Sequence, residues 1–167
     1  MPIATIFMVA VIALIIVGGI IFGKSLLGGG NLTNTEQEVS QIVSGVQSLY
    51  SNQVGFSGLS NTVAIAANIA PSNEVDAANG TISNPYGGSI TLQSDTTTTN
   101  AFDVVIGGLG NGACAKLATG LTAQAVEING TSVATNGQPV SPSTATSDCN
   151  AGAGGNSVTL VETQANG

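Results

Sequence analysis

The chain has 167 residues, with two basic residues, nine acidic residues and no histidine, so its formal net charge is −7. This balance leaves no basic patch for a polyanion, and we expect no nucleic-acid binding. Without histidine, neither a Ser/His/Asp nor a Cys/His catalytic arrangement can form, and the two cysteines have no histidine to complete a zinc set. We therefore expect no enzyme, no metal and no cofactor.

Residues 1–27 form an apolar segment at the start of the chain. No charged residue occurs from Ile3 to Phe22, and a helix of this length spans roughly 30 Å, about one hydrocarbon thickness. A secretory signal would carry a basic residue before the apolar run, and none is present. We expect this segment to span a membrane through its apolar positions, which are Ile3, Ile6, Phe7, Val9, Val11, Ile12, Leu14, Ile15, Ile16, Ile20 and Phe22.

Glycines weaken the second half of this segment and separate it from the rest of the chain. Gly18, Gly19 and Gly23 each cost a helix about 1 kcal/mol relative to alanine, so we expect local bending or melting there. Such a helix suits a subunit that leaves a bilayer and repacks against copies of itself. A break is predicted over residues 28–33, at Gly28, Gly29 and Gly30.

An amphipathic helix is predicted from Asn34 or Thr35 to about Asn52. Thr35 followed by Glu38 fits a capping box, which would place Glu36 and Glu38 near the positive end of the helix dipole. Apolar residues recur along this helix at a spacing of 3.6 residues and should pack on a sheet: Val39, Ile42, Val43, Val46 and Leu49.

The rest of the chain reads as strands and turns. Residues 61–71 are compatible with a short helix or a strand. A turn at residues 84–88 leads into a strand through Ile90 and Leu92, and the next strand carries Phe102, Val104 and Ile106 on one face. These two strands predict a hairpin.

A short helix at residues 113–119 is followed by a second predicted hairpin, which turns at Asn129 and Gly130. Residues 135–156 read as a long polar loop. The last strand places Val158 and Leu160 on one side, with Glu162 as a further candidate. The expected fold of residues 34–167 is α+β, a globular head in which the N-terminal helix lies across an antiparallel sheet.

Cys114 and Cys149 are the two cysteines of the sequence. Two reduced core cysteines are one interpretation, but the segment around Cys149 is too polar to be core without a tether. A disulfide formed in an oxidising compartment fits better, and closing a loop of roughly 35 residues contributes about 3 to 4 kcal/mol in the chain-entropy model.

Three stretches resemble the type IV pilins, in the type IVb branch that includes bundle-forming and conjugative thin-pilus subunits. These are "QSLYSNQVGFSGLSNT", "ISNPYGGSITL" and "NAFDVVIGGLGNGACAKLATGL". The resemblance runs from Glu36 to about Leu121, and Cys149 falls where the family's second cysteine is expected. The sequence departs from the family at Thr5, where members usually have a glutamate thought to pair with a neighbour's N-terminal amine, and in having no leader before Met1.

The resemblance implies a structural subunit that polymerises. Its apolar segment would hold it in the inner membrane, in contact with the pilus assembly machinery, and would later form the core of a helical filament made of copies of the chain. We expect the major subunit of an extracellular pilus that serves adhesion, aggregation, conjugation or motility, with host or recipient cell surfaces as further partners. The alternatives are a membrane-anchored adhesin or binding module that never polymerises, and a minor pilin or secretion pseudopilin.

Overall fold

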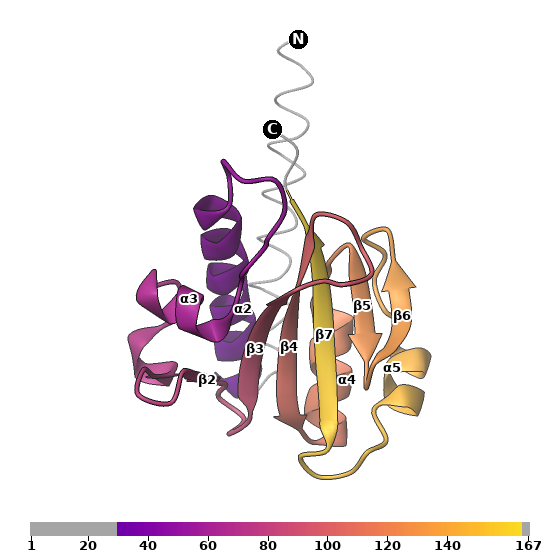
Figure 1. Ribbon diagram of the computed structural model, residues 1–167. Helices are drawn as coiled ribbons and strands as arrows, with labels where there is room; N and C mark the ends of the chain where they lie inside the picture. Colours follow the sequence, from indigo (N-terminus) through magenta and orange to yellow (C-terminus); the bar gives the residue numbers. More distant parts are fainter. Residues whose placement is uncertain (1–29, 165–167) are drawn as a thin grey trace, which may run out of the picture.

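In the computed structural model, which describes residues 30–164, a seven-stranded antiparallel sheet carries helices on one face (Figure 1). We call these residues the head. The strand order is β1-β2-β3-β4-β7-β5-β6, so the last strand of the chain lies between β4 and β5. The strands are β1 (Val75–Asp76), β2 (Thr81–Ser83), β3 (Ser89–Ser94), β4 (Ala101–Leu109), β5 (Ala125–Ile128), β6 (Thr131–Thr135) and β7 (Asn156–Thr163).

Strands β4 and β7 form the centre of the sheet, and their register explains the core. Val104 lies opposite Leu160 and Ile106 opposite Val158, and β5 continues the same rows on the other side of β7. Because side chains alternate between the faces of a strand, these residues all point toward the helices, and each is at most 1% exposed. The alternation predicted from the sequence is thereby confirmed.

Both predicted hairpins are present. Strands β3 and β4 pair antiparallel, and β5 pairs with β6 through the two-residue turn at Asn129 and Gly130. These two residues have φ angles of 52° and 80°, the left-handed conformation that a tight hairpin turn requires and that asparagine and glycine tolerate best. Local turn chemistry therefore sets this part of the register.

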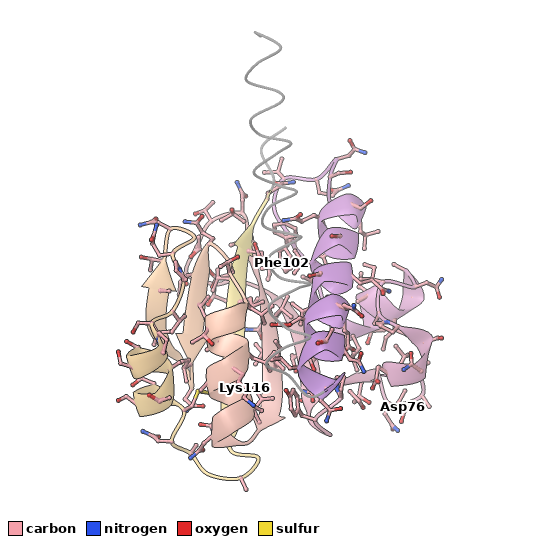
Figure 2. All side chains as sticks on the ribbon, turned by 180° about the vertical axis from the view of Figure 1, so that it is seen from behind. Asp76, Phe102 and Lys116 are labelled. Atoms are coloured by element: carbon pink, nitrogen blue, oxygen red, sulfur yellow. A yellow bond between two sulfur atoms is a disulfide. The ribbon has the colours of Figure 1, made fainter. Side chains whose placement is uncertain are left out.

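Two helices cover the inner face of the sheet side by side, α2 (Gly30–Leu49) and α4 (Asn111–Gly120) (Figure 2). Helix α3 (Asn61–Ala66) and the 3-10 turn η1 (Ser72–Glu74) lie on the flank of α2, next to β2 and β3. Helix α5 (Pro142–Asp148) contacts α4 on the opposite flank. The α+β fold with a helix across an antiparallel sheet is confirmed.

The start of α2 corrects the expectation from the sequence. The chain is already helical at Gly30, the first described residue, so residues 30–33 form a helical turn. The Thr35 hydroxyl donates to the carbonyl oxygen of Asn31 at 2.8 Å, a bond made inside a helix, and so it does not cap one. The predicted capping box was wrong because a threonine three residues before a glutamate also fits a helix body. The helix ends at Leu49, earlier than predicted.

Two further segments, which the sequence left open or assigned to a loop, are helical in part. Of the residues left open between helix and strand, 61–66 form α3, whose N-cap Ser60 accepts a bond from the Val63 amide at 3.3 Å. The segment predicted to be a long loop contains α5, which starts with Ser141 as N-cap and Pro142 at its first turn. Serine followed by proline is a common helix start, but α5 lacks the apolar stripe by which helices are usually found.

Candidate assembly surfaces of the head

Helix α2 packs on the sheet through most of the predicted face. Val43 is half-buried against the same core, and the fully packed positions are Val39, Ile42 and Val46. Leu49 was also predicted on this face, but it is 45% exposed and the prediction was wrong. The helix ends at this residue, and Tyr50 closes the core instead by stacking on Phe56, which in turn contacts Phe102 with ring centroids 4.6 Å apart.

The predicted filament core, from Ile3 to Phe22, lies outside the described residues, as do the predicted hinge glycines Gly18, Gly19, Gly23, Gly28 and Gly29. Their roles remain predictions. Gly30 is in α2, where a Cβ atom would meet no other atom within 4 Å. Within residues 30–164, the helices are too short or too polar to cross a bilayer.

A disulfide joins Cys114 on α4 to Cys149 directly after α5, which confirms the predicted bridge. The two Cα atoms are 5.8 Å apart, and the side chains are 0% and 2% exposed. We call residues 114–149 the disulfide-bounded region; it contains α5 and the β5–β6 hairpin. Because Leu117 and Ala118 on the same helix are also fully buried, α4 is fixed to the sheet and its outer face is held in place.

Asn156, at the start of β7, connects this region to the sheet. Its side-chain amide donates to the Leu109 carbonyl at 3.2 Å and to Asn111 Oδ1 at 2.9 Å, and its oxygen accepts from Asn129 Nδ2 at 3.0 Å and from the Ala151 amide. The residue is 1% exposed. Sequence analysis missed this residue because a polar residue at a strand start is usually at the surface.

The "NPYGG" turn packs directly on β4. Asn84 is 2% exposed; its oxygen accepts from the amides of Tyr86 and Gly88, and its amide donates to the Gly107 carbonyl at 2.9 Å. A Cβ atom at Gly88 would collide with the Gly107 carbonyl. The glycines of "GGLGNG" therefore serve this close approach and the turn that leads into α4.

Two carboxylates on α2 are buried; the sequence had placed them in the first turn of the helix, near the positive end of its dipole. Glu36 and Glu38 are 4% and 5% exposed. An earlier start would have found Glu36, since an apolar stripe that begins at Leu32 passes through it before reaching Val39. Burial, with a further contribution from the negative charge of Glu74, raises the pKa of Glu38 to about 7.

Glu38, Gln41, Glu74 and Asn73 line a groove of about 360 Å³ between α2 and η1. We call it the acidic groove. On the other flank, α4 presents Lys116 to solvent (Figure 2). The helix-covered face therefore carries a negative groove at one side and a positive side chain at the other.

The structure resembles solved type IV pilins. A type IVb pilin from Salmonella typhi superposes with a TM-score of 0.57 over 83% of this chain and all of that one, at 21% identity. TcpA, a type IV pilin from Vibrio cholerae El Tor biotype, gives a TM-score of 0.60 over 81% of this chain and all of that one, at 13% identity. At these identities the likeness establishes the fold.

Sequence relatives point the same way. The major structural subunits of the bundle-forming pilus from Escherichia coli O127:H6 and O111:H- are each 28% identical to this chain over 127 residues. The match covers 73% of this chain and 66% of each relative, slightly less than two thirds of their length. The family model described as PilS N terminal matches residues 30–163, nearly the whole head. The chain belongs to this PilS N-terminal family, and its head has the type IV pilin fold.

Proposed function

We propose that the chain is the major structural subunit of an extracellular type IVb-like pilus and polymerises through its N-terminal segment. The observation that carries the proposal is the uncharged apolar run from Ile3 to Phe22, placed directly before a head with the pilin fold. Relatives of 28% identity bear the description of a major pilus subunit, which supports the same role here.

An apolar helix is stable in surroundings that are themselves apolar. Lipid and the packed helices of identical copies are both apolar environments, so the uncharged run from Ile3 to Phe22 can move from one to the other at little cost. A charged side chain at the same positions would cost several kcal/mol in both environments. The segment would first anchor the subunit in the inner membrane, next to the assembly machinery, and then form the filament core.

The glycines of this segment fit the same transition. Gly18, Gly19 and Gly23 lower the cost of unwinding the helix locally, and Gly28 and Gly29 precede the first turn of α2. We propose that they let the core helices extend or bend where neighbouring copies crowd each other. The chain acts by assembly and has no catalytic role in this proposal.

The test introduces a charge into the proposed core. Ile12→Asp and Ile16→Asp should abolish surface filaments, because each buries an unpaired carboxylate, while the matched control Ile12→Leu should assemble normally. Filaments sheared from cells are counted by negative-stain microscopy, and the chain is quantified in the membrane and sheared fractions. Normal filament numbers from both aspartate variants would contradict the proposal.

The same fractions separate the alternative functions. A membrane-anchored adhesin or binding module would stay in the membrane fraction and yield no filaments of this chain. A minor pilin or pseudopilin would be present in sheared filaments at a small fraction of the main component. We expect filaments made chiefly of this chain. The same proposal includes their use in adhesion, aggregation, conjugation or motility, and their contact with host or recipient cells.

A further inference from the structure

The distribution of charge over the head is uneven. All nine acidic residues of the sequence lie in the described part of the chain, where Lys116 is the one basic residue. Copies packed side by side would therefore repel one another at neutral pH. Any contact between heads that uses Lys116 would offset part of this repulsion.

Lys116 is displayed on a fixed support. It is exposed on the outer face of α4 and makes no ion pair with residues 30–164. Two residues earlier, Cys114 is tied to Cys149, and Leu117 is fully buried against the sheet. The position from which this ammonium group projects is therefore held by a covalent bond and by core packing.

The acidic groove lies on the opposite flank and lacks a positive partner among the described residues. Both carboxylate oxygens of Glu38 are buried and accept no hydrogen bond from the described residues, and Glu74 on the groove wall is half-exposed. The Glu74 charge contributes to the raised pKa of Glu38, so the two carboxylates repel each other across the groove. A cation at the groove mouth would relieve this repulsion.

We propose that Lys116 of one copy docks at the acidic groove of the neighbouring copy in the filament, with Glu74 as its direct partner and Glu38 beneath it. The inference rests on the proposed function, since it requires polymerisation. Figure 2 shows Lys116 on α4 and, beyond α2, the flank marked by Asp76, two residues after Glu74. A contact between two different patches of identical subunits is heterologous, and its repetition builds an open fibre when the rotation between copies does not close a ring.

Charge reversal tests the pairing. Lys116→Glu and Glu74→Lys should each lower filament yield about tenfold by placing like charges together, and the double variant should restore it. Glu127→Lys on β5 is the matched control, and it should not restore the filament yield that Lys116→Glu loses. Thermal unfolding and disulfide formation of each variant show whether the head remains folded, so that a loss of filaments can be assigned to the contact.

Cross-linking gives a direct readout in the wild-type protein. Filaments assembled from a mixture of isotopically light and heavy copies are treated with a carbodiimide, which joins an amine to a carboxylate without a spacer. We expect a Lys116–Glu74 link between light and heavy copies. A link from Lys24 to Glu74, or from Lys116 to other carboxylates alone, would overturn the pairing.

The two proposals fail in different ways. A wild-type chain that forms no filaments would overturn the proposed function. Normal yields from Lys116→Glu and Glu74→Lys, with wild-type filaments present, would overturn only the pairing of Lys116 with the acidic groove. The pairing would also be overturned if the double variant, with a folded head, gave no higher filament yield than the single variants.

Discussion

The two flanks of the helix-covered face are stabilised in different ways. On the side of α4 and α5, a disulfide and the buried amide of Asn156 connect segments that are far apart in the sequence, and the polar atoms of Asn156 are well bonded. On the side of α2 and η1, packing of apolar residues holds the structure, and the carboxylate of Glu38 is buried without a hydrogen bond from the described residues.

This difference in bonding means that one flank contributes most to the stability of the head, whereas the other keeps a group whose burial costs stability. A satisfied polar network and a covalent bridge make a rigid support, whereas a buried carboxylate lowers stability unless something outside the head compensates it. In the proposed contact between heads, Lys116 needs a rigid support, and the acidic groove needs a negative charge that its own head does not compensate. We therefore expect loss of the disulfide on one flank and neutralisation of Glu38 on the other to have effects of opposite sign on the stability of the isolated chain.

The largest effect is expected on the disulfide flank. Cys149→Ser should lower the free energy of unfolding by about 3 to 4 kcal/mol, because the loop of 35 residues is no longer closed in the unfolded chain. Urea unfolding of the full chain in detergent measures the change. Cys114→Ser is the matched control and should cost the same amount, with no further loss in the double variant. Equal stability of the wild-type chain with and without reductant would contradict this prediction.

On the other flank, Glu38→Gln should increase stability at pH 8. The pKa of Glu38 is raised to about 7 in the folded chain, from an ordinary value of 4.5, so the folded state holds its proton more tightly than the unfolded state. The associated stability is complete below about pH 4.5 and is lost as the pH rises through 7, by about 1 to 3 kcal/mol. The glutamine is neutral throughout and should remove this loss.

Urea unfolding at pH 4.5 and pH 8 provides the measurement. Asp76→Asn serves as a control with little pH dependence over this range, because hydrogen bonds from Asn79 lower the pKa of this exposed carboxyl below its ordinary value of 3.8, and its contribution is lost only at more acid pH. Glu162, whose pKa burial also raises to about 7, contributes a similar pH dependence from β7 and should be tested in parallel. An unchanged pH dependence in Glu38→Gln would show that the carboxylate is compensated within the chain.

How much the sequence could predict depends on whether a feature arises from a local pattern or from contacts between distant segments. Alternation along β4 and β7, the Asn129–Gly130 turn and the pairing of the cysteines depend on local patterns and on there being just two cysteines, so they were predicted correctly. The insertion of β7 between β4 and β5, the bonds of Asn156 and the acidic groove depend on contacts between distant segments. Period and propensity carry no information about such contacts.

The end of α2 provides the smallest effect. Helical spacing assigns Leu49 to the packed face together with Val46, but Leu49 is 45% exposed and Val46 is fully buried. Leu49→Ala should therefore change the free energy of unfolding by less than about 0.5 kcal/mol, whereas the matched change Ile42→Ala should cost about 2 to 5 kcal/mol. Urea unfolding of both variants measures the contrast. A loss at Leu49 close to that at Ile42 would mean that the helix continues to pack beyond Val46, and that the spacing rule holds to the last turn.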